Sequence, residues 1–117
     1  LPNSPIKTVY ITPLSHYDFG FVEPPEQVRE RAARHIDEVI RVAEQNPNFK
    51  WTIESVWQVN EWLKRQKKTT SVLPKDKEKI ARLVKLIKSG KVALSTAWGS
   101  MHTDFMGAEE LNRLAYD

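Results

Sequence analysis

The alternation of short strand-like segments with longer amphipathic segments constrains the fold of this chain more than any other feature. The strand-like segments are rich in β-branched and aromatic side chains, and they are residues 7–12, 49–54 and 91–98. Patterns of helical periodicity begin at Pro25, Ser55, Pro74 and Gly107. Strands that alternate with helices predict right-handed crossovers and a parallel sheet, so the expected fold class is α/β.

Each of the first three helical patterns predicts one buried face. Their apolar stripes are Val28, Ala32, Ile36, Val39 and Ala43 in the first, Val56, Val59, Trp62 and Leu63 in the second, and Ile80, Leu83, Val84 and Ile87 in the third. Ser55 and Gln58 have the spacing of a capping box at the start of the second helix. Gly90 is expected to end the third helix, because glycine readily adopts the conformation that closes a helix.

The number of strands predicts that the sheet is incomplete. A length of 117 residues allows one domain. Three strands are few for a parallel sheet, both of whose faces need cover, so we expect the opening units of a larger α/β barrel or open sheet. The absence of a signal-peptide pattern and of cysteine favours the cytoplasm. The chain opens without Met, and its last helical pattern has no stop signal. Residues 1–117 are therefore expected to be a piece of a longer protein.

Composition excludes several classes of function. The chain has no cysteine, so disulfides and thiol catalysis are ruled out. Its 18 basic and 15 acidic residues leave a net charge of +3, which is too small and too scattered to predict a nucleic-acid partner. No apolar run is long enough to cross a membrane, and no membrane partner is expected.

Two His-x-Asp motifs follow predicted strand ends, where ligands bind in α/β folds. They are His16-Tyr17-Asp18 and His102-Thr103-Asp104. An imidazole and a carboxylate at this spacing can both ligate Zn²⁺. The alternative is that these residues occupy surface loops, with Asp104 capping the following helix. His35 lies near an apolar stripe without an acidic partner at metal spacing, so we expect it to pack at the boundary of the core.

Aromatic side chains accompany the first motif. Phe19 and Phe21 follow it directly, and apolar ring faces beside polar ligands suit a pyranose, which has both C–H faces and hydroxyl groups. Ordinary core packing is the alternative interpretation of both phenylalanines. The tryptophans of this part of the chain are expected to lie in the core, and they are Trp57, Trp62 and Trp98.

Four segments, taken in order, resemble glycoside hydrolase family 38, the α-mannosidases. Residues 13–21, Pro-Leu-Ser-His-Tyr-Asp-Phe-Gly-Phe, resemble the family's His-x-Asp-x-Gly-Trp opening motif. Residues 49–54, with Trp57 and Trp62, are similar to its second-strand segment, and residues 86–92 to its lysine-serine-glycine lead into the next strand. Trp98, Met101 and Asp104 resemble the following strand-end block more loosely.

The resemblance implies a seven-stranded β/α barrel that binds one zinc ion. This chain would then be a partial parallel (β/α) barrel, made of the first three β/α units. His16 and Asp18 match the two ligands that the family takes from its first strand end, and Phe21 stands where the family has a sugar-stacking Trp. Leu14 and Phe105 depart from the pattern, because many members have a second His and an acidic residue there. The catalytic nucleophile and acid are expected beyond Asp117, so no catalytic residue is assigned within this chain.

The resulting prediction is an N-terminal fragment of a zinc-dependent retaining glycosidase whose carbohydrate substrate is an α-mannoside. The isolated fragment is expected to be inactive and to bind zinc weakly or not at all, with His102 and Asp104 as secondary ligands at most. It is also expected to self-associate through its exposed sheet edge. The alternatives are a metal-dependent deacetylase or amidohydrolase, and a small non-catalytic α/β binding domain.

Overall fold

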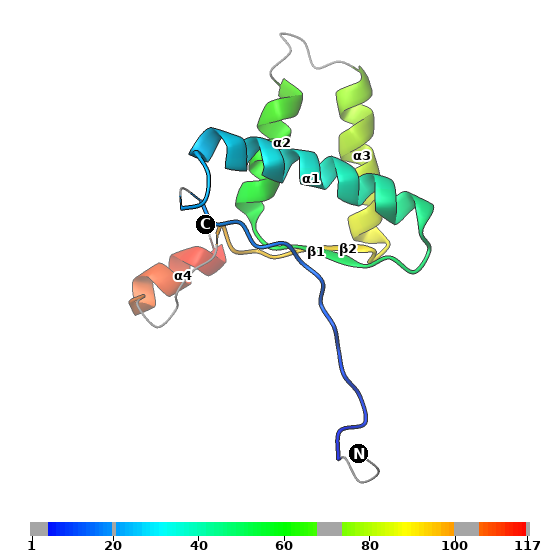
Figure 1. Ribbon diagram of the computed structural model, residues 1–117. Coiled ribbons are helices and arrows are strands. Elements are labelled where there is room, and N and C mark those ends of the chain that lie inside the picture. Colours follow the sequence, from blue (N-terminus) through cyan, green and yellow to red (C-terminus); the bar gives the residue numbers. More distant parts are fainter. Residues whose placement is uncertain (1–4, 20, 68–73, 100–105, 117) are drawn as a thin grey trace.

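The structure is a computed structural model that describes residues 5–19, 21–67, 74–99 and 106–116. Apart from the predicted first strand, its helices and strands follow the predicted order (Figure 1). They are α1 (Pro25–Gln45), β1 (Trp51–Ile53), α2 (Val56–Lys67), α3 (Pro74–Lys88), β2 (Val92–Leu94) and α4 (Ala108–Tyr116). The α/β class is therefore confirmed, although both strands are shorter than the segments that predict them.

The sheet is parallel, as expected, but its first strand differs from the prediction. β1 pairs with β2 in the register Thr52↔Ala93. Residues 7–12 form no strand; instead Leu14 makes a single parallel bridge to Thr52, whose N–H donates to the carbonyl of Pro13 at 2.9 Å. Before the Leu14 bridge, residues 7–12 run away from the sheet and are exposed throughout, so they have no neighbouring strand to pair with among the described residues (Figure 1).

α1 begins and packs as its sequence predicts. Pro25 is at the start of the helix, where its missing N–H costs nothing, and Glu26 lies in the first turn. The helix buries all five residues of the predicted stripe together with Ala33 and Ile40. The side chains from Ala33 onward form one core with Trp62 of α2, Leu83 and Leu86 of α3, and the inward residues of both strands.

α3 shows one error in the predicted stripe and one confirmed boundary. Leu86 is buried, whereas Val84 is 42% exposed, so the buried face is rotated slightly from the prediction. The helix ends in a Schellman motif: Gly90 has φ +68°, its N–H donates to Ile87, and the N–H of Lys91 donates to Leu86. Gly90 therefore ends α3 as expected and turns the chain directly into β2.

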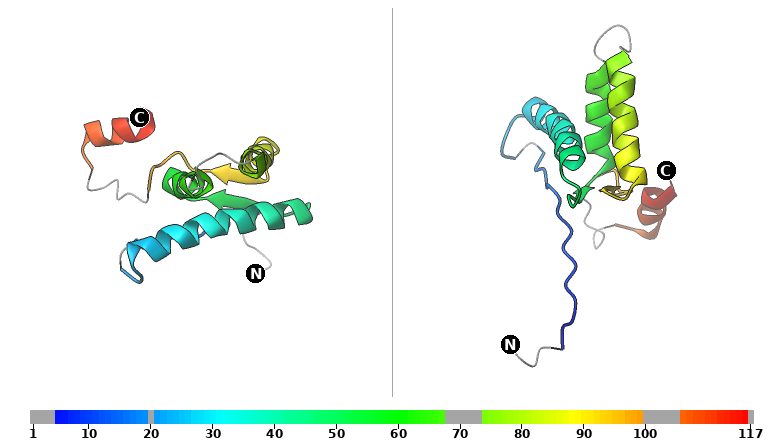
Figure 2. Two further views of the ribbon diagram at one scale, coloured as in Figure 1. Left: turned by 90° about the horizontal axis from the view of Figure 1, so that it is seen from above. Right: turned by 90° about the vertical axis from the view of Figure 1, so that its right-hand side faces the viewer.

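The helices α1, α2 and α3 all lie on one side of the sheet, and α4 lies apart from them (Figures 1 and 2). Trp51, Ile53, Val92 and Leu94 point toward these helices and join the core, whereas Ala93 on the other face is exposed. A barrel wall has this arrangement, with helices outside, but the described residues do not close a barrel. Among the described residues, no helix combines the length and apolar character needed to cross a bilayer.

Candidate functional site

Three segments meet where the parallel strands end, as the sequence predicts. They are residues 15–19 after the Leu14 bridge, residues 54–55 after β1 and residues 95–99 after β2. The first turn of α2 ties them together: the N–H groups of Val56 and Trp57 each donate at 2.9 Å to the carbonyls of Ala97 and Trp98, respectively. The Gln58 side chain donates to the Ser15 carbonyl at 3.4 Å, whereas in a capping box it would accept from the backbone N–H of Ser55.

A cleft of about 530 Å³ opens between these segments. Its lining combines ionisable groups with aromatic rings, and comprises His16, Tyr17, Asp18, Phe19, Phe21, Glu54, Ser55, Trp57, Gln58, Trp98 and Gly99. The four predicted site residues around the first motif thus share one cleft, and they are His16, Asp18, Phe19 and Phe21. Apolar faces beside a few polar groups are the composition of a small-molecule site.

His16 lies between two carboxylates. Its Nδ1 is 2.7 Å from Oε1 of Glu54, and its Nε2 is 3.4 Å from Oδ1 of Asp18. The His16 and Asp18 side chains are about half exposed, whereas that of Glu54 is 20% exposed. The hydrogen bond to Glu54, followed by the attraction of its charge, raises the pKa of His16 above the ordinary histidine value.

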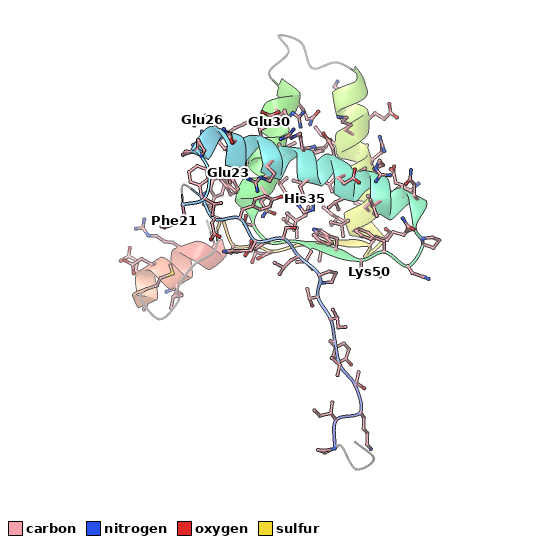
Figure 3. All side chains as sticks on the ribbon, in the orientation of Figure 1. Phe21, Glu23, Glu26, Glu30, His35 and Lys50 are labelled. Atoms are coloured by element: carbon pink, nitrogen blue, oxygen red, sulfur yellow. The ribbon has the colours of Figure 1, made fainter. Side chains whose placement is uncertain are left out.

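Tyr17 points away from its two neighbours and anchors the loop to α1. Its hydroxyl is hydrogen-bonded to Nδ1 of His35 at 2.6 Å, and the rings of His35 and Trp51 form a T-shaped pair with centroids 5.3 Å apart. Figure 3 shows His35 on the side of α1 that faces the strands. Burial raises the pKa of Tyr17 and lowers that of His35. The prediction that His35 packs at the core boundary is confirmed by its partial burial.

The aromatic groups of the cleft differ in how much ring surface is left for a ligand. Phe19 meets Trp57 edge-on at 5.4 Å, and the Arg29 guanidinium lies 5.4 Å from the centroid of its ring. Phe21, on the loop before α1 (Figure 3), is 90% exposed. Trp98 is 52% exposed, so the prediction that it lies in the core is wrong. Its backbone is held by α2 while its ring remains in the cleft.

The donor atoms of His16 and Asp18 fit one edge of a zinc site. With zinc–ligand distances of about 2.0–2.2 Å and tetrahedral angles, neighbouring donors lie roughly 3.3–3.5 Å apart. The observed separation of 3.4 Å falls within that range. Within the part of the chain that the structure describes, no group of three or more His, Asp or Glu side chains is arranged to hold a metal ion. Glu54 does not complete such a group because it bonds the opposite ring nitrogen.

The second motif lies outside the described residues, so the prediction for His102 and Asp104 is not tested by the structure. Several residues of the cleft are not among the predicted site residues, including Glu54, Trp57 and Trp98. Glu54 is the last residue of the predicted strand 49–54, but its contact with His16 spans 38 residues. No pattern in the sequence indicates a pairing at that separation.

A second cleft, of about 560 Å³, lies against Tyr17, His35 and the first turns of α1. Two of its basic side chains are engaged, because Arg31 pairs with Glu23 and Arg34 lies 4.0 Å from Glu30. This second cleft shares His16, Tyr17 and Asp18 with the cleft at the strand ends, but its lining lacks the rings of Phe21, Trp57 and Trp98 that could stack on a sugar.

Comparison with protein families identifies the class. The family described as Glycosyl hydrolases family 38 N-terminal domain matches residues 7–110. The chain belongs to this family. Membership in family 38 supports a glycoside hydrolase with a carbohydrate substrate, rather than the deacetylase or the non-catalytic binding domain considered from the sequence. Comparisons with curated proteins and with solved structures gave no match.

Proposed function

We propose that the protein is a zinc-dependent retaining glycosidase that hydrolyses α-mannosides, and that this chain forms the beginning of its seven-stranded β/α barrel. The observation that carries the proposal is the His16–Asp18 pair, whose donor atoms lie 3.4 Å apart in an aromatic-lined cleft at the strand ends. The family match to residues 7–110 supports the glycosidase class.

His16 and Asp18 are proposed to supply two of the zinc ligands. The bound ion would act as a Lewis acid that holds adjacent hydroxyl groups of the sugar. Phe21 offers a nearly free ring for the apolar face of a pyranose, and Phe19 supports the wall of the cleft beside Trp57. Together these groups would fix both the depth and the orientation of the sugar.

The carboxylates that perform the reaction are proposed to come from outside the described residues. A retaining glycosidase needs two carboxyl groups about 5–5.5 Å apart, one as nucleophile and one as acid and base. Asp18 and Glu54 are the two carboxylates that line the cleft, and both contact His16. Neither is placed to act as an independent nucleophile, so the isolated chain is expected to be inactive.

We also propose that the isolated chain self-associates. In the described ranges β2 pairs only with β1, and the extended segment before Leu14 exposes Tyr10 by 90% and Ile11 by 85%. Unpaired strand edges beside apolar side chains recruit other chains. Sedimentation at increasing concentration tests this: association is expected, and a single monomeric species at all concentrations would contradict it.

The proposed function is tested on the intact protein with aryl α-mannosides and the matched α-glucosides and β-mannosides. Turnover is expected for the α-mannosides alone, with the anomeric configuration retained by NMR, and it should be abolished by a chelator and restored by zinc. Asp18→Asn should reduce activity at least 100-fold, while the exposed-surface control Glu30→Gln should retain it. Chelator-resistant turnover by Asp18→Asn would refute the proposed zinc role.

A further inference from the structure

We propose that Glu54 is a positioning residue that fixes the ring orientation and tautomer of His16, so that Nε2 is the nitrogen offered to zinc. This inference rests on the proposed function in that it takes His16 as a ligand. It goes beyond that function in assigning a role to a carboxylate that would not itself touch metal or substrate.

Glu54 is held more firmly by its surroundings than His16. Glu54 directly follows Ile53, which is 2% exposed, and precedes Ser55, which is 4% exposed. Both flanking side chains are thus held in the packed part of the domain. His16 lies on a loop with its side chain 53% exposed, so the strand end holds the loop histidine rather than the reverse.

The imidazole of His16 makes two contacts of different length. At 2.7 Å the Nδ1–Glu54 contact has the length of a charge-assisted hydrogen bond. At 3.4 Å the Nε2–Asp18 contact is longer than an ordinary N–H···O bond, which spans about 2.7–3.2 Å. An ionised carboxylate only accepts hydrogen bonds, so the shorter contact retains the proton on Nδ1 of the neutral ring.

The two ring nitrogens of His16 point in different directions, so only one of them faces Glu54. With the proton on Nδ1, the free lone pair is on Nε2, the nitrogen that lies 3.4 Å from Oδ1 of Asp18, a separation that one edge of a tetrahedral site would span. Metal-binding histidines commonly donate their other N–H to a carboxylate, and loss of that partner typically weakens metal binding by about 10–100-fold. Glu54 is the carboxylate in that position here.

The test uses the intact protein and two independent measurements. Zinc affinity is measured by competition with a chromophoric chelator, and the tautomer of His16 by ¹⁵N NMR on metal-free protein at a pH where the ring is neutral. Glu54→Ala should weaken zinc binding by about 10–100-fold and shift the resonances from the Nδ1–H toward the Nε2–H tautomer. Glu54→Gln, whose amide oxygen still accepts from Nδ1, should lose less affinity and largely keep the tautomer.

The control is Gln58→Ala, because Gln58 bonds the same loop through the Ser15 carbonyl without contacting His16 in any bond described above. It should leave the tautomer unchanged, and urea unfolding of each variant confirms that it folds. Wild-type zinc affinity together with an unchanged tautomer in Glu54→Ala would overturn the proposal. If the unmodified protein binds no zinc, the proposed function fails, and the tautomer measurement alone still decides the role of Glu54.

Discussion

Two regions of this domain use the same residue types for opposite purposes. The packed region comprises α1, α2, α3, β1 and β2, and the strand-end region comprises residues 15–19, 54–55 and 95–99. Trp62 is fully buried in the first, whereas Trp98 is half exposed in the second. His35 packs against Trp51, whereas His16 faces solvent between carboxylates. Residue type alone therefore does not decide whether a side chain belongs to the core or to the candidate site; its surroundings decide it.

The tryptophan pair should give the largest contrast. Trp62 packs at the centre of the core and donates from its indole N–H to Asp37 at 2.9 Å. Trp62→Ala is expected to lower the free energy of unfolding by about 3–5 kcal/mol, measured by urea denaturation. Trp98→Ala should change it by no more than about 0.5 kcal/mol while weakening sugar binding in the intact protein. Equal destabilisation by both substitutions would remove the distinction between the regions.

The glycine pair should give a smaller effect with a different cause. Gly90 has φ +68°, and a Cβ placed there meets no atom within 4 Å, so Gly90→Ala introduces backbone strain without a clash. The expected cost is about 1–2 kcal/mol. Gly99 also has open space around it but no positive φ, so Gly99→Ala should be close to neutral in the same denaturation experiment. A neutral Gly90→Ala would show that the Schellman motif does not hold the α3–β2 turn.

The histidine pair should differ in the sign of its pH dependence. The pKa of His16 is raised by Glu54, so its contribution to stability is present below pH 6.5 and is lost as the pH rises through the folded value. The pKa of His35 is lowered by burial, so its contribution is present above pH 6.5 and is lost as the pH falls through the folded value. NMR titration should therefore find one midpoint on each side of 6.5.

Glu54→Gln sharpens this experiment because it alters one histidine alone. The midpoint of His16 should fall toward 6.5, since the hydrogen bond to an ionised carboxylate is its largest cause, while that of His35 stays in place. Movement of both midpoints together would indicate that the two rings are coupled through Tyr17 rather than set by their own surroundings.

The packed region could be predicted well from the sequence because its signals are local. The 3.6-residue periodicity of α1 identifies its entire predicted stripe, and Gly90 marks the end of α3. Whether Val84 or Leu86 is buried depends on where α3 contacts its neighbours, which periodicity does not specify. The missing strand at residues 7–12 has the same kind of cause, because a β-prone segment forms a strand only where a partner is available.

The strand-end region could be predicted only in part. His16 and Asp18 follow a predicted strand end, and parallel strands end at one edge of a sheet. This predicts them as site residues, and the cleft is found at that edge. The His16–Glu54 bond depends on the register between the first segment and β1 and on side-chain direction, neither of which the sequence reveals. The apolar character of Trp98 predicts a place in the core, but its side chain is half exposed among the described residues.

The most direct test of the central claim is to locate zinc by anomalous X-ray scattering at its absorption edge in crystals of the intact protein. We predict a single peak at the strand ends, about 2.0–2.2 Å from both Nε2 of His16 and a carboxylate oxygen of Asp18. Asp18→Asn crystals should show a weaker peak or none. A peak elsewhere in the protein, or no peak after zinc loading, would contradict the account.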